Sequence, residues 1–258
     1  MDQRELYERQ IQRGTNAGAS PHLFGQREAA LLDWIRYSLG DSLEKPENRI
    51  VELSVGDGQL SRALARAVPN ATIDCVDISL TRLERCRQLA QSAGLDSRMR
   101  FLELNLDSEF DQVPRSNYDV VIAIDVLEHI FDPFHFLRHC CEILKSNGYL
   151  FLRVPNVAYI KRRGAILCGH LPITSSWFET PGSFQSWKER HGWDGGHLHF
   201  FTLSALRWLL AQEGFESLSW SDVGASGEKI RRLWPGMLFG NLAIFARKMS
   251  KRSNASAH

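Results

Sequence analysis

The stretch Val51-Glu52-Leu53-Ser54-Val55-Gly56-Asp57-Gly58-Gln59-Leu60 runs from an apolar strand into a helix through two glycines. A second apolar run, residues 71–76, ends beside Asp77, which lies 21 residues after Gly56. Glycines let a turn approach a ligand closely, and a carboxylate at the end of the next strand can accept hydrogen bonds from a ribose diol. The pattern predicts a nucleotide-binding turn. The alternative is an ordinary strand-to-helix turn that binds nothing.

Two well-known phosphate-binding patterns are missing from this turn. A dinucleotide-binding turn requires GxGxxG, but Gly56-Asp57-Gly58 is followed by Gln59, Leu60 and Ser61. The P-loop requires Gly-Lys-Ser/Thr, which occurs nowhere in the chain. The turn therefore fits neither class of binder.

Apolar runs alternate with helical patterns along most of the chain, which predicts an α/β fold with a doubly wound, Rossmann-like sheet. Near-continuous apolar runs such as residues 120–124 are typical of parallel strands that are buried on both faces. We expect seven strands, the last one antiparallel, with an aromatic and glycine-rich insertion before the final helix and strands. The strands are expected at residues 49–55, 71–76, 99–104, 118–124, 149–154, from 215 to about 220, and 241–246; the helices at 59–67, 80–93, 134–144 and 203–213.

Length and composition indicate one large domain of a protein without membrane-spanning segments. The chain has 258 residues, 43% hydrophobic and 24% charged, with a net charge of +1. No apolar stretch approaches the roughly 18 residues that a membrane span needs, and the near-neutral charge gives no reason to expect a polyanion. We therefore expect no membrane partner and regard nucleic acid as an unfavoured one. Five cysteines without a CxxC pair predict buried, reduced thiols and a cytoplasmic location.

The domain organisation expected from these patterns has three parts. Residues 1–45 form an N-terminal helical lid, residues 46–248 form the ligand-binding domain, and residues 249–258 form a disordered tail. An insertion on the substrate side occupies about residues 157–200. Two basic runs, residues 161–163 and 231–232, are interpreted as solvated faces, with phosphate contacts as the alternative.

Two further motifs place polar side chains where they can act on a substrate. Asp125-Val126-Leu127-Glu128-His129-Ile130-Phe131-Asp132-Pro133 follows the fourth expected strand, and ligands bind at this carboxyl edge in open α/β sheets. The segment Gly196-His197-Leu198-His199-Phe200-Phe201-Thr202 precedes a helix that Thr202 or Ser204 can cap. Glu128, His129 and at least one of His197 and His199 are expected to face the substrate, although each has an alternative structural role.

Together these motifs resemble the class I S-adenosylmethionine (SAM)-dependent methyltransferases. Within this family, the chain resembles the group with a VLEHxxDP signature. It is similar to ubiquinone-biosynthesis O-methyltransferases, MetW-like proteins and methyltransferases of glycan or natural-product gene clusters. The chain departs from the family's glycine pattern at Ser54, where a glycine is usual. The resemblance implies SAM as the cofactor, bound by Glu52, Ser54, Gly56, Asp57, Gly58, Asp77, Ile78, Asn105, Leu106, Asp107 and Asp125.

The same resemblance implies a methyl acceptor beside Glu128, His129 and His197, which we expect to be the catalytic residues. We predict a small-molecule hydroxyl acceptor, with His129 or His197 as general base. A MetW-like regulatory partner of another enzyme is one alternative. A second is an RNA 3′-end ribose methyltransferase, whose metal motif resembles Asp125, Glu128, His129 and His197 and would suit Mg²⁺ or Mn²⁺. We leave the metal site and a homodimer open.

Overall fold

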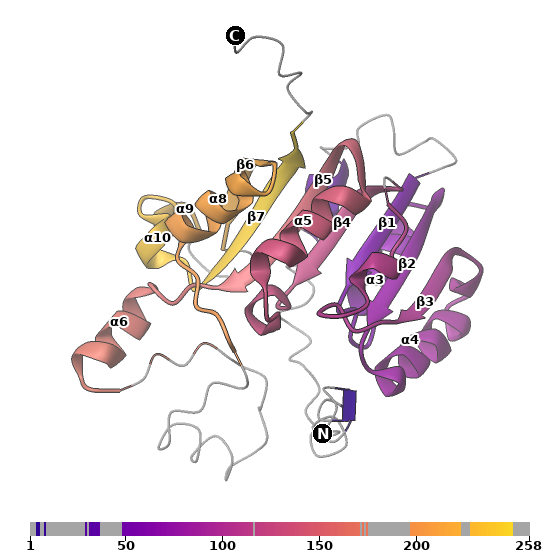
Figure 1. Cartoon of the computed structure of the whole chain (residues 1–258), viewed down its shortest axis with the longest axis horizontal. Coiled ribbons are helices and arrows are strands. Elements are labelled where there is room, and N and C mark those ends of the chain that lie inside the picture. Colours follow the sequence, from indigo (N-terminus) through magenta and orange to yellow (C-terminus); the bar gives the residue numbers. More distant parts are fainter. Residues whose placement is uncertain are drawn as a thin grey trace.

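The computed structural model describes residues 4–5, 8, 29, 31–36, 48–115, 117–170, 172, 174, 197–222 and 228–249. At its centre is a seven-stranded sheet in the order β3-β2-β1-β4-β5-β7-β6 (Figure 1). The first five strands are parallel, and β7 runs antiparallel to both β5 and β6. This confirms the predicted fold. The strands are β1 Asn48–Leu53, β2 Ala71–Asp77, β3 Met99–Glu103, β4 Tyr118–Ile124, β5 Leu144–Pro155, β6 Phe215–Ser221 and β7 Asn241–Lys248.

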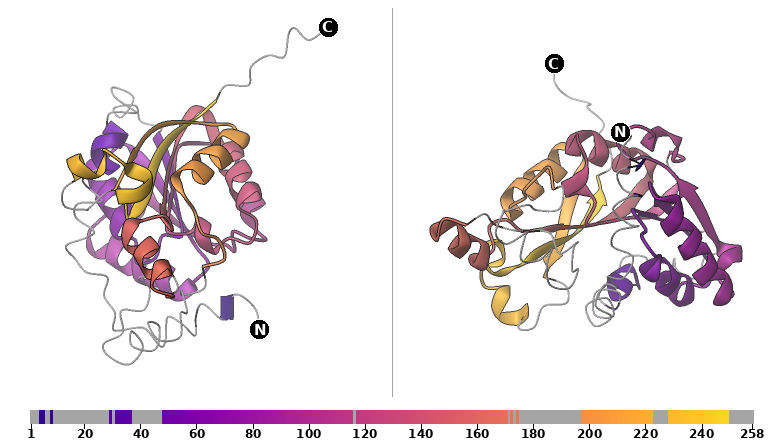
Figure 2. Two further views of the ribbon diagram at one scale, coloured as in Figure 1. Left: turned by 90° about the vertical axis from the view of Figure 1, so that its left-hand side faces the viewer. Right: turned by 90° about the horizontal axis from the view of Figure 1, so that it is seen from below.

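Helices cover both faces of the sheet (Figure 2, right). The helices are α3 Gln59–Ala67, α4 Leu80–Ser92, α5 Pro133–Ile143, α6 Ile160–Leu167, α8 Leu203–Gln212, α9 Glu228–Arg231 and α10 Pro235–Leu238, with short 3-10 turns η2 Asp96–Arg98, η3 Phe110–Gln112 and η4 Leu127–His129. Alternate strand residues face opposite sides. Ile50 therefore joins the core formed with α3 and α4, whereas Val51 joins the core formed with α5 and α8.

The strand order reverses between β1 and β4, which are neighbours in the sheet although they are not consecutive in the chain. From β1 the chain winds outward through β2 and β3, and from β4 it winds the other way through β5. Loops at such a reversal point leave the sheet in opposite directions and open a crevice at the carboxyl edge. The turn after β1 and the segment after β4 both begin at this place.

The N-terminal region contributes to the core where it is described. Residues 31–36 are helical, as predicted, and Leu31 and Ile35 are buried in the same core as α3 and α4. Trp34 packs against Phe245 of β7, with ring centroids 4.4 Å apart. Most of the expected lid at residues 1–45, much of the insertion and nearly all of the tail lie outside the described residues.

The sequence patterns missed three helices: α6, α9 and α10. Gly164 lies within α6 and Gly236 follows Pro235 at the start of α10, so both segments resemble turns in the sequence. β5 begins at Leu144 and not at residue 149, because Leu144 already pairs with Tyr118 of β4, ahead of Asn147 with its φ of +62°. Cys168 is exposed rather than buried, although all five cysteines are free thiols, as expected. Over the residues described, no helix combines the length and hydropathy that crossing a membrane requires.

Candidate active site

The turn after β1 follows the glycine pattern closely in its backbone conformation. Ser54, Gly56 and Gly58 all have a positive φ, of 65°, 55° and 67°. The amide of Gly58 donates to the carbonyl of Val55 over 3.0 Å, which closes the turn. Because the left-handed region disfavours residues with a Cβ, this turn favours glycine at all three positions. Ser54, which replaces the family's glycine, is therefore held in a conformation that costs it free energy.

Asp77 and the glycine turn face the same point at the carboxyl edge. The amide of Gly56 donates to Oδ2 of Asp77 over 2.8 Å, and the amide of Ser79 donates to Oδ1 over 2.9 Å. Burial raises the pKa of Asp77, although Arg82 and these two backbone amides oppose the shift. Each carboxylate oxygen has a second lone pair that a ribose hydroxyl can use. The two parts of the predicted nucleotide site are thus directly hydrogen-bonded to each other.

Other residues predicted to bind SAM lie around this pair with differing exposure. Glu52 is buried at the end of β1 and accepts a hydrogen bond from the hydroxyl of Ser61 on α3. Asp57 is exposed, and its Oδ2 lies 3.6 Å from the guanidinium of Arg85 on α4. Ile78 follows Asp77 and is half-buried. Glu52 therefore connects the end of β1 to α3 through Ser61, whereas Asp57 lies on the solvent-exposed side of the turn.

The segment after β3 connects the cofactor side with the acceptor side. The side-chain oxygen of Asn105 accepts from the amide of Asp107 over 3.0 Å, and Leu106 is buried in the core. Oδ1 of Asp107 accepts from the amide of Phe131 over 2.9 Å. Phe131 belongs to the segment after β4, so Asp107 holds the loops after β3 and β4 together.

Asp125 stands apart from the residues with which it was grouped in the sequence. It has a φ of +52° and forms an ion pair with Arg153, a buried residue of β5. Its backbone amide also donates to the carbonyl of Arg153 over 3.0 Å. The group of potential metal ligands in the described residues comprises Glu128, His129 and His197, without Asp125. The four-residue metal motif therefore reduces to three residues.

Glu128, His129 and His197 come together although His197 is far away in the chain. One ligand atom from each lies within 4.8 Å of the others, and the two imidazole rings are 4.7 Å apart. The backbone explains this approach, because the carbonyl of Glu128 accepts from the amides of Leu198 and His199 over 2.8 and 3.2 Å. Glu128 itself is only 1% exposed. This places the three predicted catalytic residues in one cluster at the carboxyl edge.

The two neighbouring histidines have different partners. Nδ1 of His197 lies 2.6 Å from the hydroxyl of Thr174, which fixes the orientation of the ring. Nε2 of His199 donates to the carbonyl of Phe131 over 3.1 Å. His197 thus joins the cluster, whereas His199 braces the loop after β4. The sequence alone did not indicate which of these two histidines would join the cluster. Thr202 caps α8 through the amide of Ala205, as predicted.

Sequence reasoning missed the contacts of Arg4 and Glu8 with this edge. Arg4 forms ion pairs with Glu103 and Glu109 beside β3. The Glu8 carboxylate accepts from the hydroxyls of Ser79 and Thr81 over 2.7 and 2.6 Å. Burial alone would raise the pKa of Glu8, but the hydrogen bonds from Thr81 and Ser79 outweigh it and lower the pKa. A short polar segment without periodicity gives no signal for such contacts. Thr174 and Arg153 were missed as well, because each contacts a residue of a distant segment.

Comparisons with known proteins indicate the family and the fold. Residues 23–219 match a family described as a methyltransferase domain. The ubiquinone biosynthesis O-methyltransferase of Xanthomonas campestris pv. campestris is 32% identical over 113 residues, which is 43% of this chain and 44% of that protein. The protein of the same description from Actinobacillus pleuropneumoniae is 30% identical over 127 residues, 48% of this chain and 52% of that one. The match thus spans about half the length of these curated relatives.

Solved structures show the same fold over nearly the whole chain. Magnesium protoporphyrin IX methyltransferase from Synechocystis PCC 6803, solved with bound S-adenosylhomocysteine, has a TM-score of 0.60 and 16% identity, with 94% of each chain covered. At this identity the likeness concerns the architecture alone.

Proposed function

Because this chain belongs to the class I SAM-dependent methyltransferases, we propose that it transfers the methyl group of SAM to a hydroxyl oxygen of a small molecule. The observation that carries this proposal is the approach of Glu128, His129 and His197 to within 4.8 Å at the sheet edge that also holds Asp77. The relatives named O-methyltransferases support a hydroxyl acceptor.

In this proposal the chain's own residues hold and orient the two substrates. SAM, when bound, supplies an electrophilic methyl group on its sulfonium. Asp77 would accept hydrogen bonds from the ribose, and the turn from Ser54 to Gly58 would contact the amino-acid part. Asn105, Leu106 and Asp107 would border the adenine, with Glu52 and Ile78 completing this side. The acceptor would enter beside Glu128, so that its oxygen faces the methyl group in line with the bond that breaks.

A histidine of the cluster would take the acceptor's proton. If Nδ1–H of His197 donates to the Thr174 hydroxyl, the lone pair on Nε2 is available as the base. The acceptor oxygen would form the new C–O bond as the C–S bond of SAM breaks, and its proton would pass to Nε2 of His197. The buried Glu128 carboxylate would stabilise the imidazolium that results. His129, whose ring is 4.7 Å from that of His197, is the other candidate for this role.

An acceptor screen with labelled methyl groups tests the proposal. We expect turnover on a panel of phenols and catechols. His197→Ala should lower kcat by about 10²-fold or more, since general-base catalysis contributes about that much, while leaving the Kd for SAM unchanged. His170→Ala, which changes an exposed histidine outside the cluster, is the matched control. Unchanged kcat in His197→Ala would remove this residue from the mechanism, and labelling of no hydroxyl acceptor would contradict O-methylation.

A second candidate, metal-assisted transfer, is favoured by the same three side chains. Carboxylate and imidazole ligands suit a divalent cation such as Mn²⁺ or Mg²⁺. Thr174 beside Nδ1 of His197 would leave Nε2 as the ligand atom, an arrangement in which a neighbouring group orients a metal-binding histidine. A cation held there would lower the pKa of a bound acceptor hydroxyl. The histidines would then be ligands and not bases.

Titration with Mn²⁺ alone, followed by electron paramagnetic resonance, separates the two mechanisms without an acceptor. If the metal-assisted route holds, the protein takes up about one Mn²⁺ per chain, and Glu128→Gln and His197→Ala lose it while His170→Ala keeps it. Equal signals from free Mn²⁺ with and without protein would contradict this route. General-base catalysis by a histidine would then be the remaining mechanism.

A further inference from the structure

The segments around α6, α9 and α10 expose large apolar side chains. On α6, Ile166 and Leu167 are exposed, Leu167 at 87%. Between α9 and α10, Leu233 is 83% and Trp234 is 63% exposed, and Ile230 lies one turn earlier. No residue of α6 is buried. Exposed apolar groups gathered on one part of a protein usually mark a surface that binds something.

Basic residues outnumber acidic ones around these apolar groups, and Glu228, the first residue of α9, is the one acidic residue in α6 or α9. Lys161 and Arg163 of α6 are exposed, as are Lys229 and Arg232. The sequence of α6 contains no Asp or Glu, and neither do residues 229–238. We call the exposed apolar and basic side chains of α6 and of residues 229–234 the basic apolar surface. Its charge is positive although the whole chain is near neutral.

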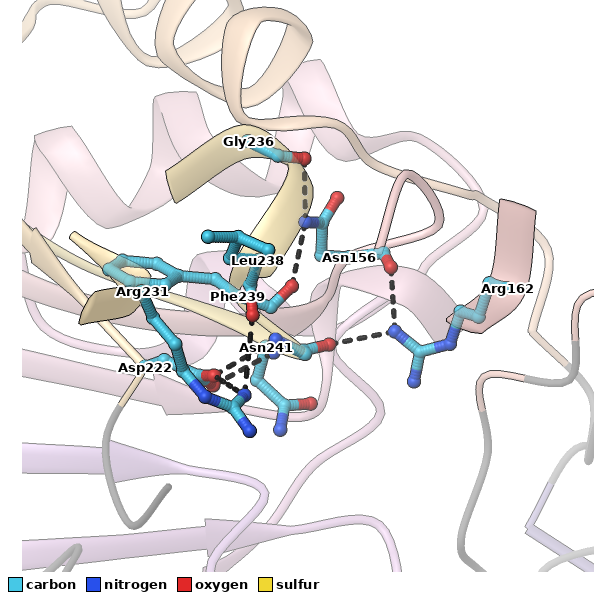
Figure 3. A network of polar contacts seen from close by, with 9 residues as sticks. Asn156, Arg162, Asp222, Arg231, Gly236, Leu238, Phe239 and Asn241 are labelled. Atoms are coloured by element: carbon cyan, nitrogen blue, oxygen red, sulfur yellow. Dashed lines mark hydrogen bonds and ion pairs between the residues drawn. The ribbon is translucent and has the colours of Figure 1, made fainter. Parts of the chain in front are cut away.

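A network of polar contacts joins the two halves of this surface (Figure 3). Nδ2 of Asn156, at the end of β5, donates to the carbonyls of Gly236 and Phe239 over 3.0 and 2.8 Å. Nη1 of Arg162 on α6 donates to the carbonyl of Gly240 over 2.7 Å. Asn156 is fully buried, so its hydrogen bond to Phe239 is shielded from water. The segment that precedes β7 is thereby fastened to the start of α6.

Tyr159 and Asp222 extend the same network. The guanidinium groups of Arg162 and Arg231 each lie 5.9 Å from the centre of the Tyr159 ring. The buried carboxylate of Asp222 accepts from Arg231 over 2.8 Å and from the amides of Gly240 and Asn241. Figures 1 and 2 place α6, α9 and α10 at the same end of the molecule. Arg162 and Arg231 thus serve the structure, whereas Lys161 and Lys229 are exposed.

We propose that the basic apolar surface docks on a lipid bilayer that carries anionic headgroups. Lys and Arg beside Leu, Ile and Trp suit the boundary between headgroups and acyl chains, where the cations meet lipid phosphates and the apolar groups enter the hydrocarbon. This is lateral binding, which needs no spanning segment. It goes against the expectation of no membrane partner, which rested on the lack of an apolar stretch long enough to span a bilayer. The charge complementarity favours an anionic bilayer over an uncharged apolar partner.

The surface lies at the edge of the sheet where an acceptor would enter. α6 follows β5 where β5 ends at Pro155, and Asn241, the first residue of β7, pairs with Pro155 there. The loop after β4, with Glu128, emerges from the same carboxyl edge. Docking would therefore bring this edge towards the bilayer.

Sedimentation with vesicles tests the proposal on the full chain. We expect binding to vesicles of equal parts phosphatidylcholine and phosphatidylglycerol, weak binding to phosphatidylcholine alone, and release at high salt. Lys161→Glu/Lys229→Glu should weaken binding by about 10-fold or more. Arg66→Glu/Arg115→Glu changes the charge equally, at exposed arginines away from the surface, and should have little effect.

The apolar half of the surface is tested by Leu167→Ser/Leu233→Ser, which should weaken binding by a similar factor. Trp208→Ser changes a 58% exposed apolar residue on α8 and is the matched control. Circular dichroism confirms that each variant is folded. Equal losses in test and control variants, or no binding to anionic vesicles at low salt, would overturn the proposal. So would a concentration-dependent dimer that Leu167→Ser/Leu233→Ser abolishes, because a second copy would then cover the surface.

Discussion

Gly58 is confined both by its backbone and by its neighbour. Its φ is +67°, and a Cβ built on it would lie 2.0 Å from Sγ of Cys86 on α4. The left-handed conformation costs a residue with a Cβ about 1–2 kcal/mol, and overpacking of a core costs about 1–3 kcal/mol more. We expect Gly58→Ala to lower the free energy of unfolding by about 2–5 kcal/mol, measured by urea denaturation.

Gly94→Ala is the matched control for this prediction. Gly94 has nearly the same φ, +66°, but a Cβ added to it would meet no atom of a neighbouring residue within 4 Å. Its substitution should cost only the backbone strain, about 1–2 kcal/mol. Equal losses in the two variants would contradict the role of Cys86 in confining the turn.

Ser54 illustrates what a sequence pattern can and cannot indicate about a residue. The sequence marked it as a departure from the family's glycine, but only the structure gives the reason that a glycine suits this place. Its φ of +65° lies in the left-handed region, and it is one of three non-glycine residues in the described chain with a positive φ. Asp125, the second of them, was expected among the cofactor and metal residues, yet its ion pair with Arg153 could not be foreseen, because no spacing relates β4 to β5.

The N-terminal residues Arg4 and Glu8 contact the carboxyl edge through polar groups, which makes this contact sensitive to pH. The pKa of Glu8 is lowered from 4.5 by Thr81 and Ser79, against the effect of burial. The pKa of Glu8 is therefore lower in the folded chain than in the unfolded chain. The carboxylate stabilises the fold fully at a pH above its pKa in the unfolded chain, and this stabilisation is lost as the pH falls through its pKa in the folded chain.

We therefore expect Glu8→Gln to lower the Tm relative to the unchanged protein at pH 7, with the difference disappearing as the pH falls below about 4. Differential scanning calorimetry over this range measures it. Glu5→Gln is the control, since Glu5 is an exposed acid in the same segment. A difference in Tm that persists undiminished at low pH would mean that Glu8 does not act through its charge.

Elements with clear periodicity were predicted well, and those without it were not. β1 to β4 and helices α3, α4, α5 and α8 follow runs of apolar residues whose burial the fold requires, such as Leu60 and Leu64 on α3. α6 has no buried residue, so no apolar face marks it in the sequence. The contact between η4 and residues 197–199 depends on backbone hydrogen bonds between segments that are far apart in the sequence. Hydrophobic periodicity does not indicate such hydrogen bonds, although the motifs did identify the residues involved.

The arrangement of the full chain follows from the reversal of strand order between β1 and β4. This topology brings the glycine turn, after β1, and the Glu128 segment, after β4, to the same carboxyl edge, while the sheet holds their strands at fixed register. The residues proposed to contact SAM at the glycine turn and those proposed to face the acceptor therefore come from separate halves of the winding. Asp107, through its bond to the amide of Phe131, ties the two halves across the edge.

Isothermal titration of the full chain with SAM tests the cofactor site most directly. We expect one SAM per chain, with binding weakened at least about 10-fold in Asp77→Asn, because a hydrogen bond from the ribose to a charged acceptor is lost. Asp33→Asn, at an exposed aspartate, should bind as the unchanged protein does. Absence of SAM binding to the folded chain, or equal affinity for SAM in Asp77→Asn, would contradict the proposal that SAM binds beside Asp77.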